Sequence, residues 1–223
     1  MIHKRFADNT NEQSVATRLR RQRFQILLTM LRDSPGPLSI LDIGGTPEYW
    51  DMMLAGVSPR PPFHITLLNL EASAVSRPDV TATVGDGRAM SQFADKQFDI
   101  VFSNSTIEHV GSFADQGRMA SEVRRIGKQY CIQTPNRYFP IEPHFVFPLF
   151  QFLPIKLRAW LLQHFNLGWH ERIQDRQAAL REVSSIRLLS RGEFQQLFPE
   201  AKIFDEKFYG WTKSFVAYTS PSP

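Results

Sequence analysis

The sequence contains one cysteine, Cys131, and a single cysteine excludes an internal disulfide framework. The chain also lacks any apolar run close to the roughly 20 residues that a membrane-spanning helix needs. The longest early apolar run, residues 26–31, is interrupted by Thr29 and does not resemble a signal peptide. These absences are typical of a protein in a reducing compartment, and we expect a cytoplasmic location.

Charge of neither sign dominates, because 26 basic and 22 acidic residues leave a formal net charge of +4. Much of the excess lies in Arg18, Arg20, Arg21 and Arg23. We interpret this cluster as a solvated helix face, with a polyanion or a membrane surface as the alternative contact, and expect no nucleic-acid partner. The 223 residues are enough for one substantial core, so the length favours one domain with an elaboration.

Residues 38–47 predict a buried strand that runs into a glycine turn and then a helix. The apolar run shows no polar alternation before Asp42, as in a parallel strand that is covered on both faces. Gly44 and Gly45 allow a tight turn and the close approach of a ligand, and Thr46 can cap the helix. The pattern therefore predicts a small-molecule site at the carboxyl end of this strand.

Further strands alternate with helical segments along the chain. Helices are expected over 11–32 and 113–126, and strands over 63–70, 80–84, 98–104 and 130–134. This alternation predicts a parallel sheet wound by right-handed crossovers, in which the strand tips gather along one edge. The candidate polar residues at these tips are Glu71, Asp86, Ser103 and Thr134.

Two of these acids have a specific interpretation. Glu71 follows the second strand, where a carboxylate can accept hydrogen bonds from a ribose diol, although it could also only solvate the turn. Asp86 lies between Gly85 and Gly87 and could accept a hydrogen bond from an exocyclic amine such as that of adenine. Aspartate and glycine are equally ordinary in turns, so both interpretations of Asp86 stay open.

The order of these motifs resembles the class I S-adenosylmethionine-dependent methyltransferases, most closely the branch called methyltransferase type 11. The resemblance rests on Leu-Asp-Ile-Gly-Gly at 41–45, the acid after the second strand, Gly-Asp-Gly at 85–87, and Phe-Asp-Ile-Val-Phe-Ser-Asn followed by Ile-Glu-His-Val at 98–110. It implies an α/β fold with a Rossmann-like, doubly wound, seven-stranded sheet, mostly parallel with an antiparallel last strand. It also implies S-adenosylmethionine as cofactor.

The resemblance further implies the residues that contact the cofactor. They are Asp42, Gly44, Gly45 and Thr46 at the methionine end, Glu71 at the ribose, Asp86, Gly87 and Arg88 around the adenine, and Ser103 and Asn104 beneath the sulfonium.

The expected reaction is direct displacement, in which a small-molecule or a lipid- or sugar-linked acceptor attacks the sulfonium methyl group. His144 is the preferred base for a hydroxyl acceptor and His109 the second, because imidazole takes up a proton near neutral pH. Some relatives that methylate quinone precursors hold a metal with an acid three residues before their Glu-His pair, where this chain has Ser105. With only Glu108 and His109 as ligands, no metal is expected.

Two other functions stay open. Thr46 and Glu48 replace glycines that the family usually has, which leaves a non-catalytic module that uses the fold for interaction or membrane docking. An NAD-dependent oxidoreductase is the minor alternative. A dinucleotide loop needs Gly-x-Gly-x-x-Gly, and Thr46 and Tyr49 stand at its second and third glycine positions.

The expected organisation is a helical extension over 1–36 and a methyltransferase domain over 37–223, with a helical insertion over 137–190 as substrate site or lid. The candidate substrate-binding residues of this insertion are Arg137, Tyr138 and Glu142.

The apolar segment 145–167 has four open interpretations: a lid, a peripheral contact with the inner face of a membrane, a homodimer interface, or ordinary core. Beyond it, Ser190 is expected to cap a helix over 191–198 through a capping box. Residues 201–208 and 213–218 are expected to form a closing hairpin.

Overall fold

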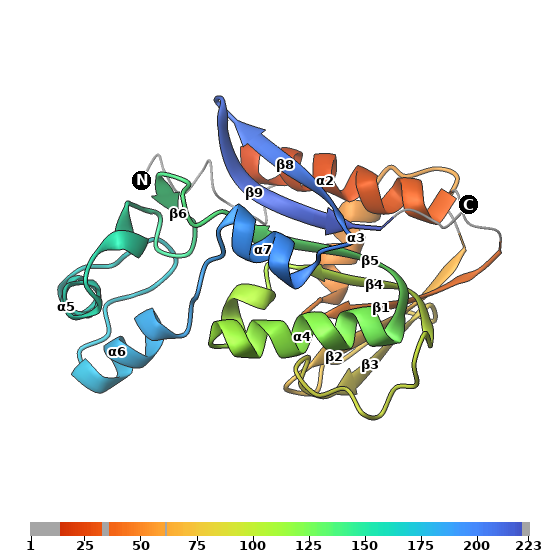
Figure 1. The fold of residues 1–223 in the computed structure, drawn as a ribbon, viewed down its shortest axis with the longest axis horizontal. Helices are drawn as coiled ribbons and strands as arrows, with labels where there is room; N and C mark the ends of the chain where they lie inside the picture. Colours follow the sequence, from red (N-terminus) through yellow and green to blue (C-terminus); the bar gives the residue numbers. More distant parts are fainter. Residues whose placement is uncertain (1–13, 33–35, 61, 220–223) are drawn as a thin grey trace.

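The fold is built on one seven-stranded sheet in the order β3-β2-β1-β4-β5-β9-β8. The computed structural model describes residues 14–32, 36–60 and 62–219 (Figure 1). Strands β1 to β5 pair in parallel, and β9 is antiparallel to both β5 and β8. The predicted Rossmann-like sheet with an antiparallel last strand is therefore confirmed. Its strands are β1 Leu38–Ile43, β2 Phe63–Asn69, β3 Val80–Val84, β4 Phe98–Asn104, β5 Gly127–Pro135, β8 Lys202–Phe208 and β9 Trp211–Tyr218.

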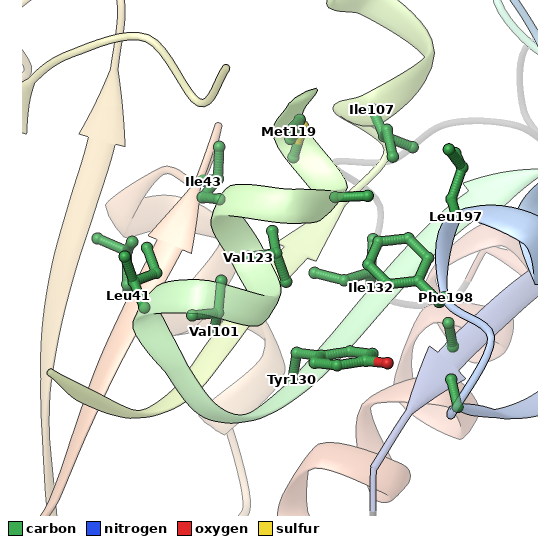
Figure 2. Packing of buried hydrophobic residues seen from close by; sticks show 14 of the residues in the cluster. Leu41, Ile43, Val101, Ile107, Met119, Val123, Tyr130, Ile132, Leu197 and Phe198 are labelled. Atoms are coloured by element: carbon green, nitrogen blue, oxygen red, sulfur yellow. The ribbon is translucent and has the colours of Figure 1, made fainter. Parts of the chain in front are cut away.

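Helices cover both faces of the sheet, because side chains along the buried strands point alternately to opposite faces. On one face, Met119 and Val123 pack with Leu197 over Ile43 and Ile132 (Figure 2). The helices in the described ranges are α2 Val15–Arg32, α3 Pro47–Leu54, α4 Phe113–Ile126, α5 Ile155–His164, α6 Arg176–Ser184 and α7 Arg191–Leu197, with the 3₁₀ turns η1 Ile107–His109 and η2 Phe150–Phe152.

The other face is covered by α2 and α3. Leu27 and Leu28 of α2 and Trp50 of α3 pack with Ile40 and Ile100 of the sheet. Each such fully buried leucine contributes about 1.5–3 kcal/mol relative to an exposed one. The helix expected over 11–32 is confirmed as α2, whereas the part of the prediction that covers residues 11–13 lies outside the described residues.

The basic cluster of α2 differs from the prediction. Arg18 is exposed, as expected, but Arg23 is only 8% exposed. Nη1 of Arg23 donates to the carboxylate of Glu206 at 3.1 and 3.2 Å, and its Nη2 donates to Asn104 at 3.2 Å. The solvated-face interpretation is therefore wrong for Arg23, because its partners come from β8 and β4, far away in the sequence.

Helix caps and turns explain several boundaries. Ser190 and Glu193 form the predicted capping box at the start of α7, and Ser112 and Asp115 form another at the start of α4. The closing hairpin is tighter than expected, since β9 begins at Trp211. Tyr209 and Gly210 both have positive φ, as a two-residue primed turn requires.

The insertion lies at one end of the molecule (Figure 1) and has a small hydrophobic core of its own. It holds the helices α5 and α6 and a short antiparallel pair, β6 Ile141–Glu142 with β7 Phe147–Pro148, that the sequence did not predict. Phe145, Phe150, Leu162 and Val183 are buried in this core. Among the described residues, none of the helices is both long and apolar enough to cross a bilayer.

Candidate functional site

The glycine turn follows β1 directly and is held by close packing. Gly44 has φ +78°, and a Cβ there would collide with the side chain of Thr106. A Cβ on Gly45 would collide with the carboxylate of Asp42. The positive φ of Gly44 agrees with the predicted tight turn, and neighbouring protein atoms also favour glycine at both positions, which the sequence did not indicate.

Thr46 caps the next helix as predicted. Its Oγ1 accepts a hydrogen bond from the backbone N–H of Tyr49 at 3.3 Å, and Pro47 occupies the first turn of α3. This cap explains why a threonine stands where the resembling family often has glycine.

A pocket of about 190 Å³ opens at this turn. Five residues that were predicted to contact the cofactor line it, together with Arg20, Tyr49 and Phe102. The five are Asp42, Gly44, Gly45, Thr46 and Asn104. The structure therefore brings the expected methionine-end residues together with Asn104, which comes from the tip of β4.

Asp42 is the buried acid of this pocket, with 1% of its surface exposed. Its Oδ2 accepts a hydrogen bond from the indole N–H of Trp50 at 2.7 Å. Its Oδ1 is also buried and has no hydrogen-bond partner within the described ranges. Burial raises the pKa of Asp42 to about 7, against the opposing effect of the Trp50 hydrogen bond. A buried carboxylate oxygen without a donor is suited to a ligand that brings a cationic or N–H group.

The other predicted cofactor residues do not line this pocket. Ser103 is fully buried, and its Oγ donates to the carbonyl of Ile43 at 2.9 Å, which ties β4 to β1. Glu71 is exposed beyond the end of β2.

The acid predicted for the adenine is engaged within the protein. Asp86 forms an ion pair with Arg88 at 2.6 Å, and this contact holds the pKa of Asp86 below its usual range. Gly87 is buried against Ile43 and Met119.

A second polar group surrounds His144 at the start of the insertion. The Nδ1 of His144 lies 2.6 Å from Oε1 of Glu142, and its Nε2 lies 3.9 Å from Oε1 of Glu108. The ring of His109 meets that of His144 edge-on, with 4.8 Å between centroids. The structure thus brings both predicted bases together, although they come from distant parts of the chain.

The carboxylates of this group differ in how well they are satisfied. Glu142 is 2% exposed and accepts hydrogen bonds from the backbone N–H groups of His144 and Phe145, at 2.8 and 2.7 Å. Glu108 is fully buried, and its Oε2 accepts from Thr134 at 3.1 Å. Oε1 of Glu108 has no hydrogen-bond partner in the described part of the chain.

These surroundings move the pKa values in opposite directions. Burial raises the pKa of Glu108 to about 7, and the nearby His144 only partly opposes this. Burial lowers the pKa of His144, but the hydrogen bond and charge of Glu142 outweigh it, so that the net shift is upward. Desolvation of the ring and then the charge of His144 lower the pKa of His109.

The expectation of no metal assumed that only Glu108 and His109 could act as ligands, and this assumption is wrong. Glu108, His109 and His144 offer three ligand atoms that all lie within 4.8 Å of one another, so a third ligand exists. It comes from the insertion, and motif spacing around Glu108 could not show it. The side chain of Ser105, at the position considered for a further acid, donates to Gln133 at 2.8 Å.

The glycine-turn pocket and the His144 group are joined by the chain from Asn104 to His109. Asn104 lines the pocket, and Oγ1 of Thr106 donates to the carbonyl of Ile43 at 3.1 Å. Glu108 and His109 follow within one 3₁₀ turn and face His144. One short segment therefore positions both groups at the same edge of the sheet.

The sequence matches a known domain family over residues 53–130, and that family is described as a methyltransferase domain. Over these residues the chain is similar to methyltransferase domains. An uncharacterized protein from Mycobacterium tuberculosis is 36% identical over 77 residues. This match spans 34% of the present chain and only 25% of the length of that relative.

Solved structures show that the fold of this chain is shared at low sequence identity. The CurJ carbon methyltransferase aligns with a TM-score of 0.58 and 11% identity over 95% of this chain and 56% of its own. The magnesium protoporphyrin IX methyltransferase from Synechocystis, solved with bound SAH, aligns with a TM-score of 0.52 and 8% identity over 91% of this chain and 83% of its own. The type 11-like resemblance of the motifs is confirmed.

The sequence did not predict four residues at this pocket: Arg20, Tyr49 and Phe102 line it, and Asn69 contacts Gly45 of its lining. Arg20 lines the pocket, and its pKa is lowered to about 10 by burial and then by Arg23. The signal was the spacing of Arg20 and Arg23, which places both on one face of a helix. Asn69 ends β2, and its Nδ2 donates to the carbonyl of Gly45 at 3.0 Å.

The three predicted substrate residues have different positions. Arg137 and Glu142 line a second cavity, of about 200 Å³, between the insertion and the residues before α7. Tyr138 is 60% exposed and stacks on Phe152, with 6.0 Å between ring centroids.

Proposed function

We propose that this methyltransferase domain transfers a methyl group from S-adenosylmethionine to an acceptor held between the strand tips and the insertion. The pocket at the glycine turn carries this proposal, because it combines a buried acceptor atom with a nearby cation. The family match and the shared fold support the same cofactor.

The pocket residues fit the methionine end of this cofactor, which carries an ammonium and a carboxylate group. Oδ1 of Asp42 is the unpartnered acceptor that an ammonium group would satisfy. The guanidinium of Arg20 is the cation of the pocket lining and suits a carboxylate. The remaining assignments follow the resemblance, with Glu71 at the ribose and Asp86, Gly87 and Arg88 near the adenine.

S-adenosylmethionine, when bound, supplies an electrophilic methyl group on its sulfonium. For a hydroxyl acceptor, the oxygen forms the new bond to the methyl carbon, the carbon–sulfur bond breaks, and the electron pair stays on sulfur. We assign the released proton to Nε2 of His144. The carboxylate of Glu142 acts as an acceptor here, so Nδ1 of His144 donates to it and Nε2 is left as the basic atom. Glu142 is thus a positioning residue, and His109 is the second candidate base.

A thermal-shift series separates this function from its alternatives. The purified protein should be stabilised by S-adenosylmethionine and by its demethylated product, because a ligand of the folded state raises the melting temperature. Stabilisation by NAD alone would support the oxidoreductase. No stabilisation by any of these ligands would support the non-catalytic module.

We also propose that the insertion docks on a membrane surface. Its exposed side chains include Leu149, Phe152, Trp160, Phe165 and Trp169, each between 45% and 54% exposed. Exposed basic residues accompany them on the same insertion, namely Lys156, Arg172, Arg176 and Arg181. Aromatic and apolar groups with basic residues nearby are typical of proteins that lie on an anionic bilayer. A homodimer contact would cover the same surface and is the alternative to be tested.

A further inference from the structure

The cavity between the insertion and the segment before α7 is lined by both charged and apolar groups. Its volume is about 200 Å³, and its lining includes Arg137, Arg158, Arg187 and Glu142. Phe145 and Phe150 form part of its apolar wall. The volume is below the roughly 300–1,000 Å³ of typical small-molecule pockets, which suits one functional group and its neighbouring atoms.

The negative charge in this lining is already engaged. Glu142 accepts two backbone N–H groups and the ring N–H of His144, all within 2.8 Å. An acidic side chain with this many donors has little capacity left for the arginines of the cavity. The negative charge of Glu142 is therefore directed to His144 more than to the arginines of the cavity.

The three arginines differ in their partners. Arg187 donates to Gln116 at 2.8 Å and to Glu193 at 2.5 Å, and its guanidinium lies 4.9 Å above the ring of Phe113. Its charge is therefore matched by a carboxylate.

Arg158 is less well matched. Its Nη1 donates to the carbonyl of Val183 at 3.3 Å, and its Nε is buried without a hydrogen-bond partner among the described residues. Burial lowers the pKa of Arg158, although the charge of Glu142 opposes this. A guanidinium that is partly desolvated and lacks a carboxylate partner is costly unless an anion completes the site.

Arg137 and Gln151 complete the polar side of the cavity. The side chain of Arg137 is exposed and makes no hydrogen bond or ion pair within the described ranges, so it is available to a ligand. Nε2 of Gln151 donates to the carbonyls of Arg137 and Phe139, at 2.9 and 2.8 Å. These two bonds fix the backbone that carries Arg137.

We infer that this cavity binds an anionic group, a carboxylate or a phosphate, carried by the methyl acceptor on an apolar or aromatic body. Planar guanidinium groups bind both anions with paired hydrogen bonds, and the phenylalanine wall suits the body next to the charge. This inference rests on the proposed function, because it takes the ligand of the cavity to be the methyl acceptor. Glu142 connects the two sites, since it lines the cavity and also contacts His144. An anion at Arg158 would thereby place the rest of the acceptor near His144.

The test uses the full chain saturated with SAH and measures dissociation constants by ligand-observed NMR titration. The probes are phenyl phosphate, benzoate and the neutral benzyl alcohol, at constant ionic strength. We expect both anions to bind at least about tenfold more tightly than the alcohol, as charge-assisted contacts predict. A preference for phenyl phosphate identifies a phosphate-bearing acceptor, and a preference for benzoate identifies a carboxylate-bearing one.

Arg158→Gln should weaken anion binding about tenfold. Lys156→Gln is the matched control, since it removes one positive charge from the same helix outside the cavity, and it should bind the anions as the unaltered protein does. Arg137→Gln is the second variant, because its exposed side chain can be changed without disturbing the fold. Equal affinity for the alcohol and the anions, or anion binding unchanged in both arginine variants, would overturn the inference.

A separate titration with SAH distinguishes this inference from the proposed function. Its affinity should be the same in the unaltered protein and in Arg158→Gln. Failure of SAH to bind the unaltered protein would contradict the methyl-transfer proposal and leave the anion site to be judged by the anion titrations in the SAH-free protein.

Discussion

The glycine-turn pocket and the cavity of the insertion have opposite electrostatic defects. At the glycine turn, the carboxylate of Asp42 lacks a donor on one oxygen while Arg20 stands nearby. In the insertion, the carboxylate of Glu142 accepts three hydrogen bonds, and the Nε of Arg158 has no hydrogen-bond partner among the described residues. The first arrangement suits a ligand group with both charges, and the second suits an anion.

The two regions also differ in how they are supported. The glycine turn is attached to the central sheet, and the neighbouring side chains leave no room for a Cβ on Gly44 or Gly45. The insertion cavity is closed by a small separate core of helices α5 and α6. This difference indicates that cofactor binding should be sensitive to single changes in the sheet, whereas acceptor binding should tolerate change in the insertion outside its charged lining.

The largest expected effect concerns the residues proposed to bind the cofactor. Asp42→Ala and Glu71→Ala should each greatly weaken or abolish binding of S-adenosylmethionine while the fold survives, since each removes an acceptor proposed for the ligand. Isothermal titration calorimetry measures this effect, with circular dichroism as the check on folding. Unchanged affinity in both variants would refute the site assignment.

The next effect concerns the pair of Glu142 and His144. Glu142→Gln should lower the pKa of His144, because an adjacent carboxylate favours the charged imidazole by roughly 1–3 pKa units. Histidine NMR titration measures the shift, and Asn or Gln at position 144 assigns the signal. His64, an exposed residue of β2, provides the internal control.

A shift of the His64 signal comparable to that of His144 would mean a global change and would contradict a local effect.

Chelation distinguishes the proposed proton acceptor from a metal ligand. We expect EDTA to leave the melting temperature unchanged, whereas a clear decrease would show that Glu108, His109 and His144 hold a divalent ion.

Glu108 should make stability depend on pH. Its pKa is raised from 4.5 to about 7, so the folded state retains a proton that the unfolded state loses. Stability should therefore fall as pH rises from about 4.5 to about 7 and level off above that, by roughly 3 kcal/mol from this group. Glu108→Gln should remove that part of the decline in urea unfolding, and an identical pH profile in the variant would contradict the assignment.

Membrane docking should depend on the exposed aromatic residues of the insertion. Trp160→Ser with Phe165→Ser should reduce sedimentation with vesicles that contain phosphatidylglycerol, because these side chains supply apolar contact. Leu70→Ser is the matched control, since Leu70 is 72% exposed but lies outside the insertion. If the unaltered protein never sediments with the vesicles and forms a dimer in analytical ultracentrifugation, the surface is a contact between copies.

The smallest expected effect concerns the helix cap at the glycine turn. Thr46→Ala should destabilise the protein by about 1 kcal/mol, the usual loss for an N-cap hydroxyl. Thr46→Ser keeps the hydroxyl and should retain most of the stability. A much weaker affinity for SAH in Thr46→Ala but not in Thr46→Ser would show that the hydroxyl also contacts the ligand.

Much of the sheet was predictable because its signals are local. The boundaries of β3 and β4 agree with the expected strands over 80–84 and 98–104. The closing hairpin was predicted with too long a connection, since nothing in the pattern marks Tyr209 as a residue with positive φ. The pair β6 and β7 is only two residues long in each strand, too short for any periodic pattern.

The candidate site was only partly predictable, because sequence motifs report residues that are close together in the chain. Sequence motifs located Asp42, Gly44 and Gly45, since they lie together in one turn. They did not indicate Arg20, which reaches the pocket from α2. They also missed the contact between Glu108 and His144, since the two residues lie far apart in the chain.

The sequence by itself determined the order of strands and helices, the glycine turn, the capped helix after it and the family to which these motifs point. These features depend on hydrophobic periodicity and on residues a few positions apart, so they do not require knowledge of which distant segments pack together. The tertiary structure alone decided that Arg23 is buried against Glu206, that His144 faces Glu108, and that the Nε of Arg158 has no hydrogen-bond partner in the described part of the chain. Burial and charge pairing depend on which distant segments pack together, and a linear pattern carries no record of that packing.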